Sequence, residues 1–233
     1  MLKTNINCVN ISDTKLLSNI SFTLIPNNIY TIVGNNGSGK STLLLTMMGM
    51  LNKNDFTIDA SLFLNNQNLF KLSGKYFGKV REKDFRFISQ DSISALDPLK
   101  KIKYYFELFN FPLNKIETEL KYFRLPSYTE LKGIYPYQLS TGMAQRINIV
   151  LAILSSPTIL LMDEPTSALD LSVTNLLLQR LKDFAKEENK ILLIVTQDLP
   201  FAKAISDFIA RMTNGNLSEF TTPNLFFKEN SND

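Results

Sequence analysis

Residues 30–42 read Tyr30-Thr31-Ile32-Val33-Gly34-Asn35-Asn36-Gly37-Ser38-Gly39-Lys40-Ser41-Thr42, an apolar run that leads into a glycine-rich turn, a lysine and two hydroxyls. The pattern G-x-x-x-x-G-K-[ST] is typical of a phosphate-binding loop, because glycines let backbone amides converge on phosphate oxygens while the lysine supplies a mobile cation. The apolar residues on either side predict a strand at 29–33 and a helix at 42–51. A turn that contains a lysine by chance is the alternative, and these flanking elements disfavour it.

This phosphate loop, residues 34–42, predicts a site for the phosphates of ATP. The hydroxyl of Ser41 stands where it can ligate the magnesium ion that accompanies ATP, and the following helix would point its positive N-terminal end at the phosphates. We expect the nucleotide to be bound here by Gly34, Asn35, Asn36, Gly37, Ser38, Gly39, Lys40, Ser41 and Thr42.

The composition excludes several classes of function. The chain has 233 residues, enough for one core with an inserted subdomain, and a net charge of only +3 without a concentrated basic stripe. We therefore expect no nucleic-acid partner. The chain contains no histidine, which excludes histidine triads and histidine zinc sites, and its single cysteine cannot form an internal disulfide.

The sequence also predicts no membrane span. Its longest apolar runs, such as 147–154, are shorter than the ~20 residues that a spanning helix needs. The first residues lack the apolar core of a secretion signal. If the protein works at a membrane, we expect another chain to hold it there.

The order of apolar runs predicts an α/β fold. Alternating strands and helices indicate a mainly parallel sheet with helices on both faces, preceded by antiparallel strands and interrupted by a helical insert. We expect a nucleotide-binding core at 1–90 and 156–222, a helical subdomain at 91–155 and a polar tail at 223–233. Strands are expected at 2–11, 19–25, 29–33, 56–64, 85–89, 158–162 and 191–196, and helices at 42–51, 100–109, 114–123, 141–154, 171–186 and 201–205. The segment 69–83 fits neither pattern.

Two carboxylates, Asp163 and Glu164, follow the apolar run 159–162. At the end of a buried parallel strand beside the phosphate loop, Asp163 could hold magnesium through its water shell, and Glu164 could polarise the attacking water. A solvated turn is the alternative, which the upstream phosphate loop disfavours.

Further motifs follow in a specific order. They are Leu139-Ser140-Thr141-Gly142-Met143, Gln145-Arg146, Asp163-Glu164, Ser167-Ala168-Leu169-Asp170 and Gln197-Asp198. Over residues 2–219 this order resembles that of the ATPase subunits of ABC transporters. The resemblance implies two subunits that enclose two ATP molecules between them. It implies that Ser140 and Gly142 contact the γ-phosphate of ATP held by the partner, that Gln90 joins the magnesium site to the helical insert, and that Asp170 lies at the dimer seam.

The resemblance can be narrowed to a type of importer. The segment Phe87–Pro98 is similar to the glutamine loop of ATPases that drive peptide and nickel import, and 135–140 with Met143 resembles the first of two paired ATPases there. This implies a peripheral subunit at the cytoplasmic face of the membrane that powers import of nickel or small peptides. The expected partners are an integral membrane permease, a second ATPase subunit and, indirectly, an extracytoplasmic solute-binding protein. Peptide-type subunits often extend past the core, whereas this chain stops at residue 233, so it resembles the shorter, nickel-type subunit more.

Three departures from the family pattern predict unequal sites in a heterodimer. Thr141 replaces the usual glycine of the signature, and Gln197 stands where a histidine normally reads the γ-phosphate. An amide can donate a hydrogen bond to phosphate but cannot carry charge. No aromatic ring occurs at 11–13 to stack on adenine. The expected catalytic residues are Glu164, Lys40, Gln90 and Gln197, and the expected magnesium ligands are Ser41, Gln90 and Asp163.

Two other functions stay open at this point. One is a soluble ATPase of the same fold that serves translation or DNA repair, although such chains commonly carry two cassettes or coiled-coil arms. The other is a catalytically impaired, nucleotide-binding partner within an asymmetric ATPase heterodimer, for which Thr141 and Gln197 argue.

Overall fold

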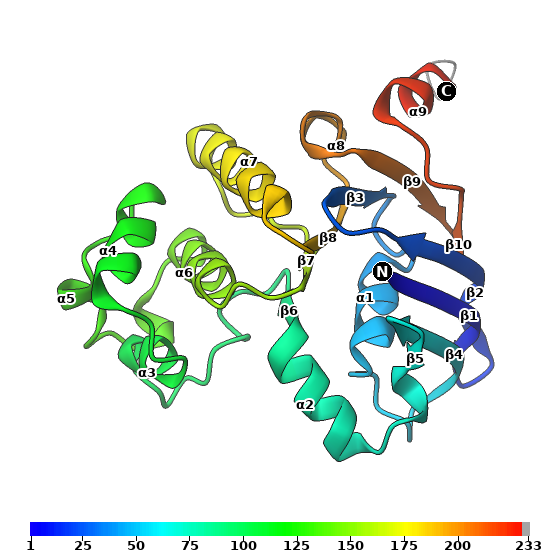
Figure 1. Ribbon diagram of the computed structural model, residues 1–233, viewed down its shortest axis with the longest axis horizontal. Coiled ribbons are helices and arrows are strands. Elements are labelled where there is room, and N and C mark those ends of the chain that lie inside the picture. Colours follow the sequence, from blue (N-terminus) through cyan, green and yellow to red (C-terminus); the bar gives the residue numbers. More distant parts are fainter. Residues whose placement is uncertain (230–233) are drawn as a thin grey trace.

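The computed structural model describes residues 1–229, which fold around two β-sheets (Figure 1). The strands are β1 Leu2–Ile11, β2 Thr14–Leu24, β3 Asn28–Val33, β4 Phe56–Leu64, β5 Gln67–Asn68, β6 Phe85–Ile88, β7 Ile159–Asp163, β8 Ile191–Thr196, β9 Phe208–Thr213 and β10 Asn216–Leu217. The first sheet is antiparallel, in the order β2-β1-β4-β5. The second has the order β10-β9-β3-β8-β7-β6, in which β10 runs antiparallel to β9 and the other neighbours are parallel. The expected fold class is therefore confirmed.

Helices connect these strands and cover both faces of the parallel sheet. They are α1 Lys40–Met48, α2 Gly74–Asp84, α3 Ile102–Leu108, α4 Leu113–Tyr122, α5 Tyr128–Leu131, α6 Thr141–Leu154, α7 Leu171–Lys186, α8 Leu199–Ile205 and α9 Pro223–Glu229, with 3₁₀ turns η1 Leu69–Lys71 and η2 Pro136–Gln138. Helix α1 packs between the two sheets, against β2, β7 and β8. Helices α3 to α6 gather in a lobe at the left of Figure 1, within the segment 91–155 that the sequence assigns to a helical subdomain.

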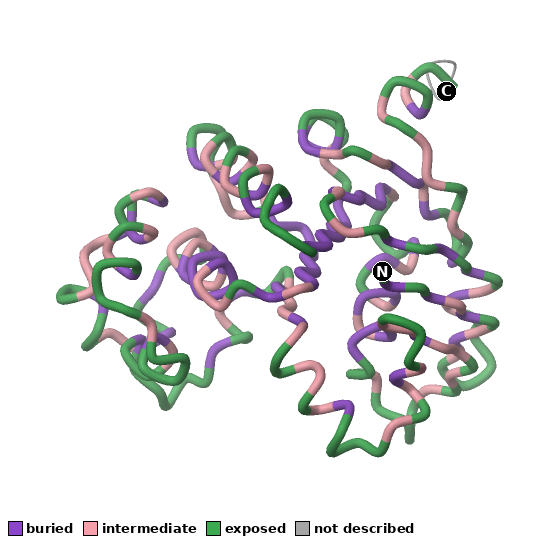
Figure 2. The backbone as a smooth tube through the Cα atoms, in the orientation of Figure 1, coloured by how far each residue is buried: buried purple, intermediate pink, exposed green. Residues whose placement is uncertain are grey.

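The core runs through the middle of the parallel sheet, where β7 and β8 are buried throughout (Figure 2). Side chains alternate between the two faces of a strand. In β7, Leu160 and Met162 pack with the helical lobe, whereas Ile159 and Leu161 pack with α1 and the antiparallel sheet. Because both faces are covered, these strands are continuous apolar runs, as is typical of parallel sheets.

Glycines set both ends of α1. Gly39 precedes the helix with a φ of 107°, and Gly49 follows it with a φ of 60°. Residues with a Cβ rarely adopt this left-handed region, so glycine suits both positions. The amide of Gly49 donates to the carbonyl oxygens at Leu45 and Thr46, which closes the last turn. The helix therefore begins at Lys40 and ends before the expected boundary of 51.

Several expected elements have the predicted bounds, namely the strands 2–11, 56–64 and 191–196 and the helices 141–154 and 171–186. The prediction was incomplete elsewhere. Strand β2 begins at Thr14 and not at 19. Its first two residues, Thr14 and Lys15, are exposed and polar and give no strand signal, and pairing with β1 holds them and the buried Leu17 in the strand. Helix α2 lies in the unassigned segment and buries only Phe77, so its sequence carries little periodicity. Strands β9 and β10 were not predicted.

Within the segment 223–233, which the sequence analysis expects to be a polar tail, residues 223–229 form α9. Phe226 is 4 % exposed and packs against Val33, Ala202 and Ile209, and the partly buried Phe227 packs against the same cluster, so aromatic side chains hold the helix in place. Residues 230–233 lie outside the described part of the chain. Within residues 1–229, no helix combines the length and apolar character that a membrane span requires.

Candidate functional site

The phosphate loop leaves the end of β3 and runs into the first turn of α1. The side chain of Lys40 folds back on this loop and is only 6 % exposed. Its Nζ donates hydrogen bonds to the carbonyl oxygens of Gly34, at 2.8 Å, and Asn35, at 3.2 Å. The loop and the lysine thus form one unit, as the motif predicts.

Glu164 faces Lys40 from the end of β7. Its Oε1 lies 3.5 Å from Lys40 Nζ, and both side chains are buried. Its Oε2 accepts hydrogen bonds from the Thr196 hydroxyl, at 2.8 Å, and from the backbone amide of Gln197, at 3.1 Å. Among the described residues, no donor is hydrogen-bonded to Oε1. One carboxylate oxygen is therefore fixed by β8, while the other faces the lysine.

Asp163 is the last residue of β7 and is 4 % exposed. Burial raises the pKa of its carboxyl above the ordinary value, while a hydrogen bond from Ser41 and the charge of Lys40 act in the opposite direction. Its Oδ1 has no hydrogen-bond partner within residues 1–229. A buried carboxylate oxygen without a partner, next to a serine hydroxyl, fits the oxygen ligands that magnesium prefers.

The described residues contain no group of three or more histidine, cysteine, aspartate or glutamate side chains that could hold a metal ion by themselves. A magnesium ion at Asp163 would therefore draw its other ligands from Ser41 and Gln90, which line the same cavity, from water and from a bound phosphate. This matches the usual behaviour of magnesium, which keeps several waters and is bound by one or two carboxylates plus phosphates.

A cavity of about 560 Å³ joins these groups. It is lined by Leu16, Asn36, Gly37, Gly39, Lys40, Ser41, Thr42, Gln90, Asp163 and Glu164. Its size is that of a typical ligand pocket. Leu16 is the lining residue that sequence reasoning missed. It is a half-buried apolar side chain in β2, and only the hairpin of β1 and β2 brings it beside the phosphate loop.

Other predicted residues lie outside this cavity. Gly34, Asn35 and Ser38 line a smaller hollow of about 120 Å³ between the phosphate loop and the end of β9. Ser140 and Gly142 are not among the lining residues of either cavity. They lie at the start of α6, where Ser140 Oγ accepts a hydrogen bond from the amide of Met143.

Gln197 lies beside the cavity without lining it. Its side chain is exposed, and its contact with Glu164 is made by the backbone amide. The predicted catalytic residues Lys40, Glu164 and Gln90 therefore share one cavity, and Gln197, which directly follows β8, contacts Glu164 through its backbone amide. Which of them take part in chemistry stays a prediction.

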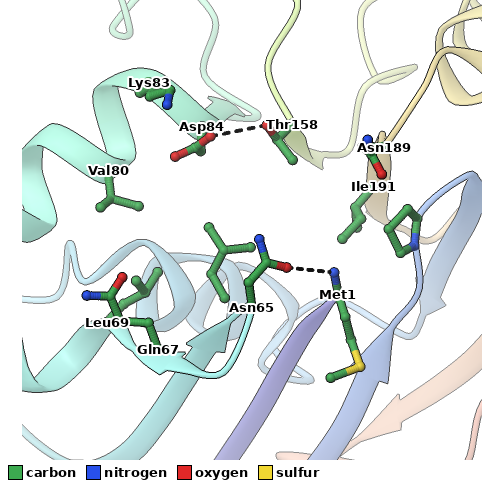
Figure 3. A pocket seen from close by; sticks show the side chains of 12 residues that line it. Met1, Asn65, Gln67, Leu69, Val80, Lys83, Asp84, Thr158, Asn189 and Ile191 are labelled. Carbon is green, nitrogen blue, oxygen red and sulfur yellow. Dashed lines mark hydrogen bonds between the residues drawn. The ribbon is translucent and has the colours of Figure 1, made fainter.

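A second pocket, of about 530 Å³, lies near the starts of β7 and β8 (Figure 3). Asp84 accepts a hydrogen bond from Thr158 there, and Asn65 accepts one from the amino group of Met1. The residues that line it include no part of the phosphate loop and neither Asp163 nor Glu164. The phosphate-loop cavity is therefore the better candidate for nucleotide chemistry.

Comparison with known proteins agrees with the geometry. A family model described as "ABC transporter" matches residues 17–167. Among curated proteins, the oligopeptide transport ATP-binding protein OppD of Lactococcus lactis subsp. cremoris (strain SK11) is 31% identical over 88% of this chain and 63% of its own length. The dipeptide transport ATP-binding protein DppD of Caldanaerobacter subterraneus subsp. tengcongensis is 31% identical over 92% of this chain and 68% of its own.

Solved structures show the same fold. The dimeric structure of a bacterial ABC transporter cassette superposes with a TM-score of 0.81 at 24% identity, covering 96% of this chain and 99% of that one. The chain spans somewhat less than two thirds of the length of OppD. Three observations agree: the match to the family model, the identity to DppD and the ordered motifs around the phosphate loop. The chain therefore belongs to the ABC transporter family.

Proposed function

We propose that this chain binds and hydrolyses ATP as the ATPase subunit of an ABC importer. The observation that supports this most directly is the meeting of Lys40, Ser41, Asp163 and Glu164 in one cavity at the phosphate loop. A lysine, a hydroxyl and two carboxylates in this arrangement are the groups that a phosphate-loop enzyme uses on ATP and magnesium.

In this proposal the backbone amides of residues 34–42 and the ammonium of Lys40 hold the terminal phosphates. Ser41, Asp163 and Gln90 would hold the magnesium ion, which when bound neutralises charge on the phosphates. Lys40 first has to exchange its contact with Glu164 Oε1 for phosphate oxygens. Glu164 is then left with an unpaired oxygen next to the γ-phosphate, where it can orient and polarise a water molecule.

A second ATPase subunit would complete each site. Ser140 and Gly142 lie at the start of α6 and do not line this chain's own cavity, which supports a role for them at a partner's ATP. Thr141 and Gln197 support a heterodimer with unequal sites, because Thr141 adds bulk near the partner's nucleotide and Gln197 cannot carry charge. Closure of such a dimer on ATP, transmitted through the helical subdomain 91–155, would drive the permease.

The names of the relatives favour small peptides as cargo over nickel, since OppD and DppD are named for oligopeptide and dipeptide transport. We propose that the subunit lies at the cytoplasmic face of the membrane on an integral permease, with a solute-binding protein acting from the other side. The alternative is a catalytically impaired, nucleotide-binding partner in the same complex. In that case ATP binds at this chain's phosphate loop but is hydrolysed slowly there.

Lys40→Met tests the proposal in membranes that contain the permease and both ATPases. The variant should lose ATP binding at the site formed by this chain's phosphate loop and should lose uptake of labelled dipeptide. Uptake of labelled nickel is measured in parallel to decide the cargo. Lys190→Met is the matched control, because Lys190 is also a buried lysine that donates to backbone carbonyls, at Ser156 and Pro157, remote from the cavity. Normal ATP binding by Lys40→Met would contradict the assignment.

Unequal sites are tested by making the corresponding lysine change in the partner ATPase. Losses of the same size from the two single changes would argue against asymmetry. A full loss from the change in the partner, with little loss from Lys40→Met, would instead identify this chain as the impaired, nucleotide-binding partner.

A further inference from the structure

Gln145 connects α6 to the segment that carries Glu164. It lies in the second turn of the helix and is 1 % exposed. Its Nε2 donates to the carbonyl oxygens of Pro165, at 2.7 Å, and Glu164, at 3.3 Å. Its Oε1 accepts from the amide of Ala168, at 3.1 Å. Both hydrogens and the oxygen of this buried amide are therefore used on one short stretch of backbone.

That stretch has an unusual backbone conformation. Glu164 has a φ of 47°, in the left-handed region that residues with a Cβ rarely occupy. Such conformations persist only where the surroundings determine them. The amide of Glu164 donates to Val195 O at 2.9 Å, and its carbonyl accepts from Gln145 and from the amide of Ser167 at 3.2 Å. Gln145 is thus the side chain that holds the carbonyl side of this residue.

The first turn of α6 also lies directly against the same segment. A Cβ on Gly142 would come within 2.8 Å of the carbonyl oxygen of Ala168. The absence of a side chain at Gly142 therefore allows a contact that any larger residue would push apart. Ala168 is therefore held by two residues that lie three positions apart on α6. Gln145 accepts a hydrogen bond from its amide, and Gly142 makes a van der Waals contact with its carbonyl oxygen.

We propose that Gln145 is a positioning residue for Glu164 and acts from the helix whose first turn faces the partner's nucleotide. The inference rests on the proposed ATP hydrolysis. When the first turn of α6 moves onto a partner's ATP, the amide of Gln145 carries the backbone of residues 164–168 with it. The Glu164 carboxylate then shifts relative to Lys40. The buried amide of Gln145 would in this way couple the partner's ATP, at the first turn of α6, to Glu164 in this chain's own cavity.

Gln145→Leu is the direct test, because leucine approximates the volume of the amide and removes all three hydrogen bonds. The variant should bind ATP with unchanged affinity, since Lys40 and the phosphate loop are untouched. Its kcat in the assembled transporter should fall about ten- to hundredfold, the range expected when a reacting group is misplaced by about 1 Å. Tyr122→Phe is the control, because it removes a donor to a backbone carbonyl, at Leu176, between α4 and α7.

A double-mutant cycle separates positioning from a general structural role. In a Glu164→Gln background, Gln145→Leu should add no further loss to single-turnover hydrolysis of labelled ATP. If Gln145→Leu does not fold, Gln145→Asn keeps an amide but withdraws it by one methylene, and it goes through the same cycle. Losses that multiply, a parallel weakening of ATP binding, or an unchanged kcat in the folded variant would each overturn the proposal.

The cycle also separates failure of this inference from failure of the proposed function. Full turnover by Glu164→Gln alone would overturn the role of Glu164 and the inference with it. Slow hydrolysis by Glu164→Gln together with full activity of Gln145→Leu would overturn the inference alone.

Discussion

Replacing Glu164 by glutamine should lower stability without nucleotide and leave it close to the wild-type value at saturating ATP. Glu164 Oε1 lies 3.5 Å from Lys40 Nζ, and both side chains are less than a tenth exposed. At an effective dielectric constant of about 20, two unit charges at that distance attract each other by about 5 kcal/mol. Desolvation offsets most of this energy, and Lys40 keeps its carbonyl partners at Gly34 and Asn35. We therefore expect Glu164→Gln to lose about 1–2 kcal/mol of stability.

ATP should offset this loss. In the wild type, ATP binding has to break the ion pair between Lys40 and Glu164, and it brings phosphate charge close to the Glu164 carboxylate. Both effects weaken binding, and both are absent in the variant because glutamine is uncharged. The variant should therefore bind ATP about 1–2 kcal/mol more tightly, which is roughly five- to thirtyfold. Hydrolysis should be slow, because an amide cannot act as a base.

Thermal unfolding with and without ATP measures both effects. For a chain of this size, 1 kcal/mol corresponds to about 2–4 °C in Tm. Glu119→Gln is the matched control, because Glu119 forms a partly buried ion pair with Arg180, at 2.8 Å, away from the cavity. It should lower Tm equally in both conditions. An unchanged Tm for nucleotide-free Glu164→Gln, or an ATP-induced rise no larger than in the wild type, would refute the reasoning.

Three further outcomes can be measured. The raised pKa of Asp163 means that the folded state binds its proton more tightly than the unfolded state, so its contribution favours folding at low pH and is lost as pH rises through the folded pKa. Asp163→Asn should therefore raise Tm at pH 7 without magnesium, lose that advantage below the ordinary aspartate pKa, and abolish magnesium-dependent ATP hydrolysis; an equal Tm at every pH would contradict this. Phe226→Ala should cost about 2–4 kcal/mol in urea unfolding, because the side chain is 4 % exposed in the core, and Phe226→Leu should cost less; equal stabilities would mean that α9 does not dock. Gly142→Ala would place a Cβ 2.8 Å from Ala168 O, so kcat should fall in the assembled transporter, and an unchanged kcat would show that this contact gives way without consequence.

The parts of the site that the sequence predicts are those encoded by contiguous residues. The phosphate loop specifies its own strand, turn and helix, and Asp163 and Glu164 follow an apolar run whose end has to lie at the carboxyl edge of a parallel sheet. The structure brings both stretches to one cavity. These features need only local spacing and the topology of the sheet.

The parts that the sequence missed depend on distant contacts or on weak periodicity. Leu16 reaches the cavity because a hairpin folds β2 against β1, which spacing does not specify. Gln145 is part of a recognisable motif, yet its partners at 164–168 follow about 20 residues later and become apparent only when α6 packs against the end of β7. Helix α9 has only seven residues, with Phe226 buried and Phe227 partly buried, and this is too short for apolar periodicity to predict a helix.

The burial of β7 on both faces has a consequence for folding fidelity. Aliphatic residues suit either layer, so hydrophobicity alone tolerates a slip of this strand past its neighbour by one position. Such an error would displace the carboxylates at its end by about 3.3 Å and leave an inactive molecule with a well-filled interior. Hydrogen bonds of a side chain at the end of the strand oppose it: Glu164 Oε2 accepts from the Thr196 hydroxyl at 2.8 Å and from the amide of Gln197 at 3.1 Å. Correct alignment of the strand and competence of the active centre are therefore specified together.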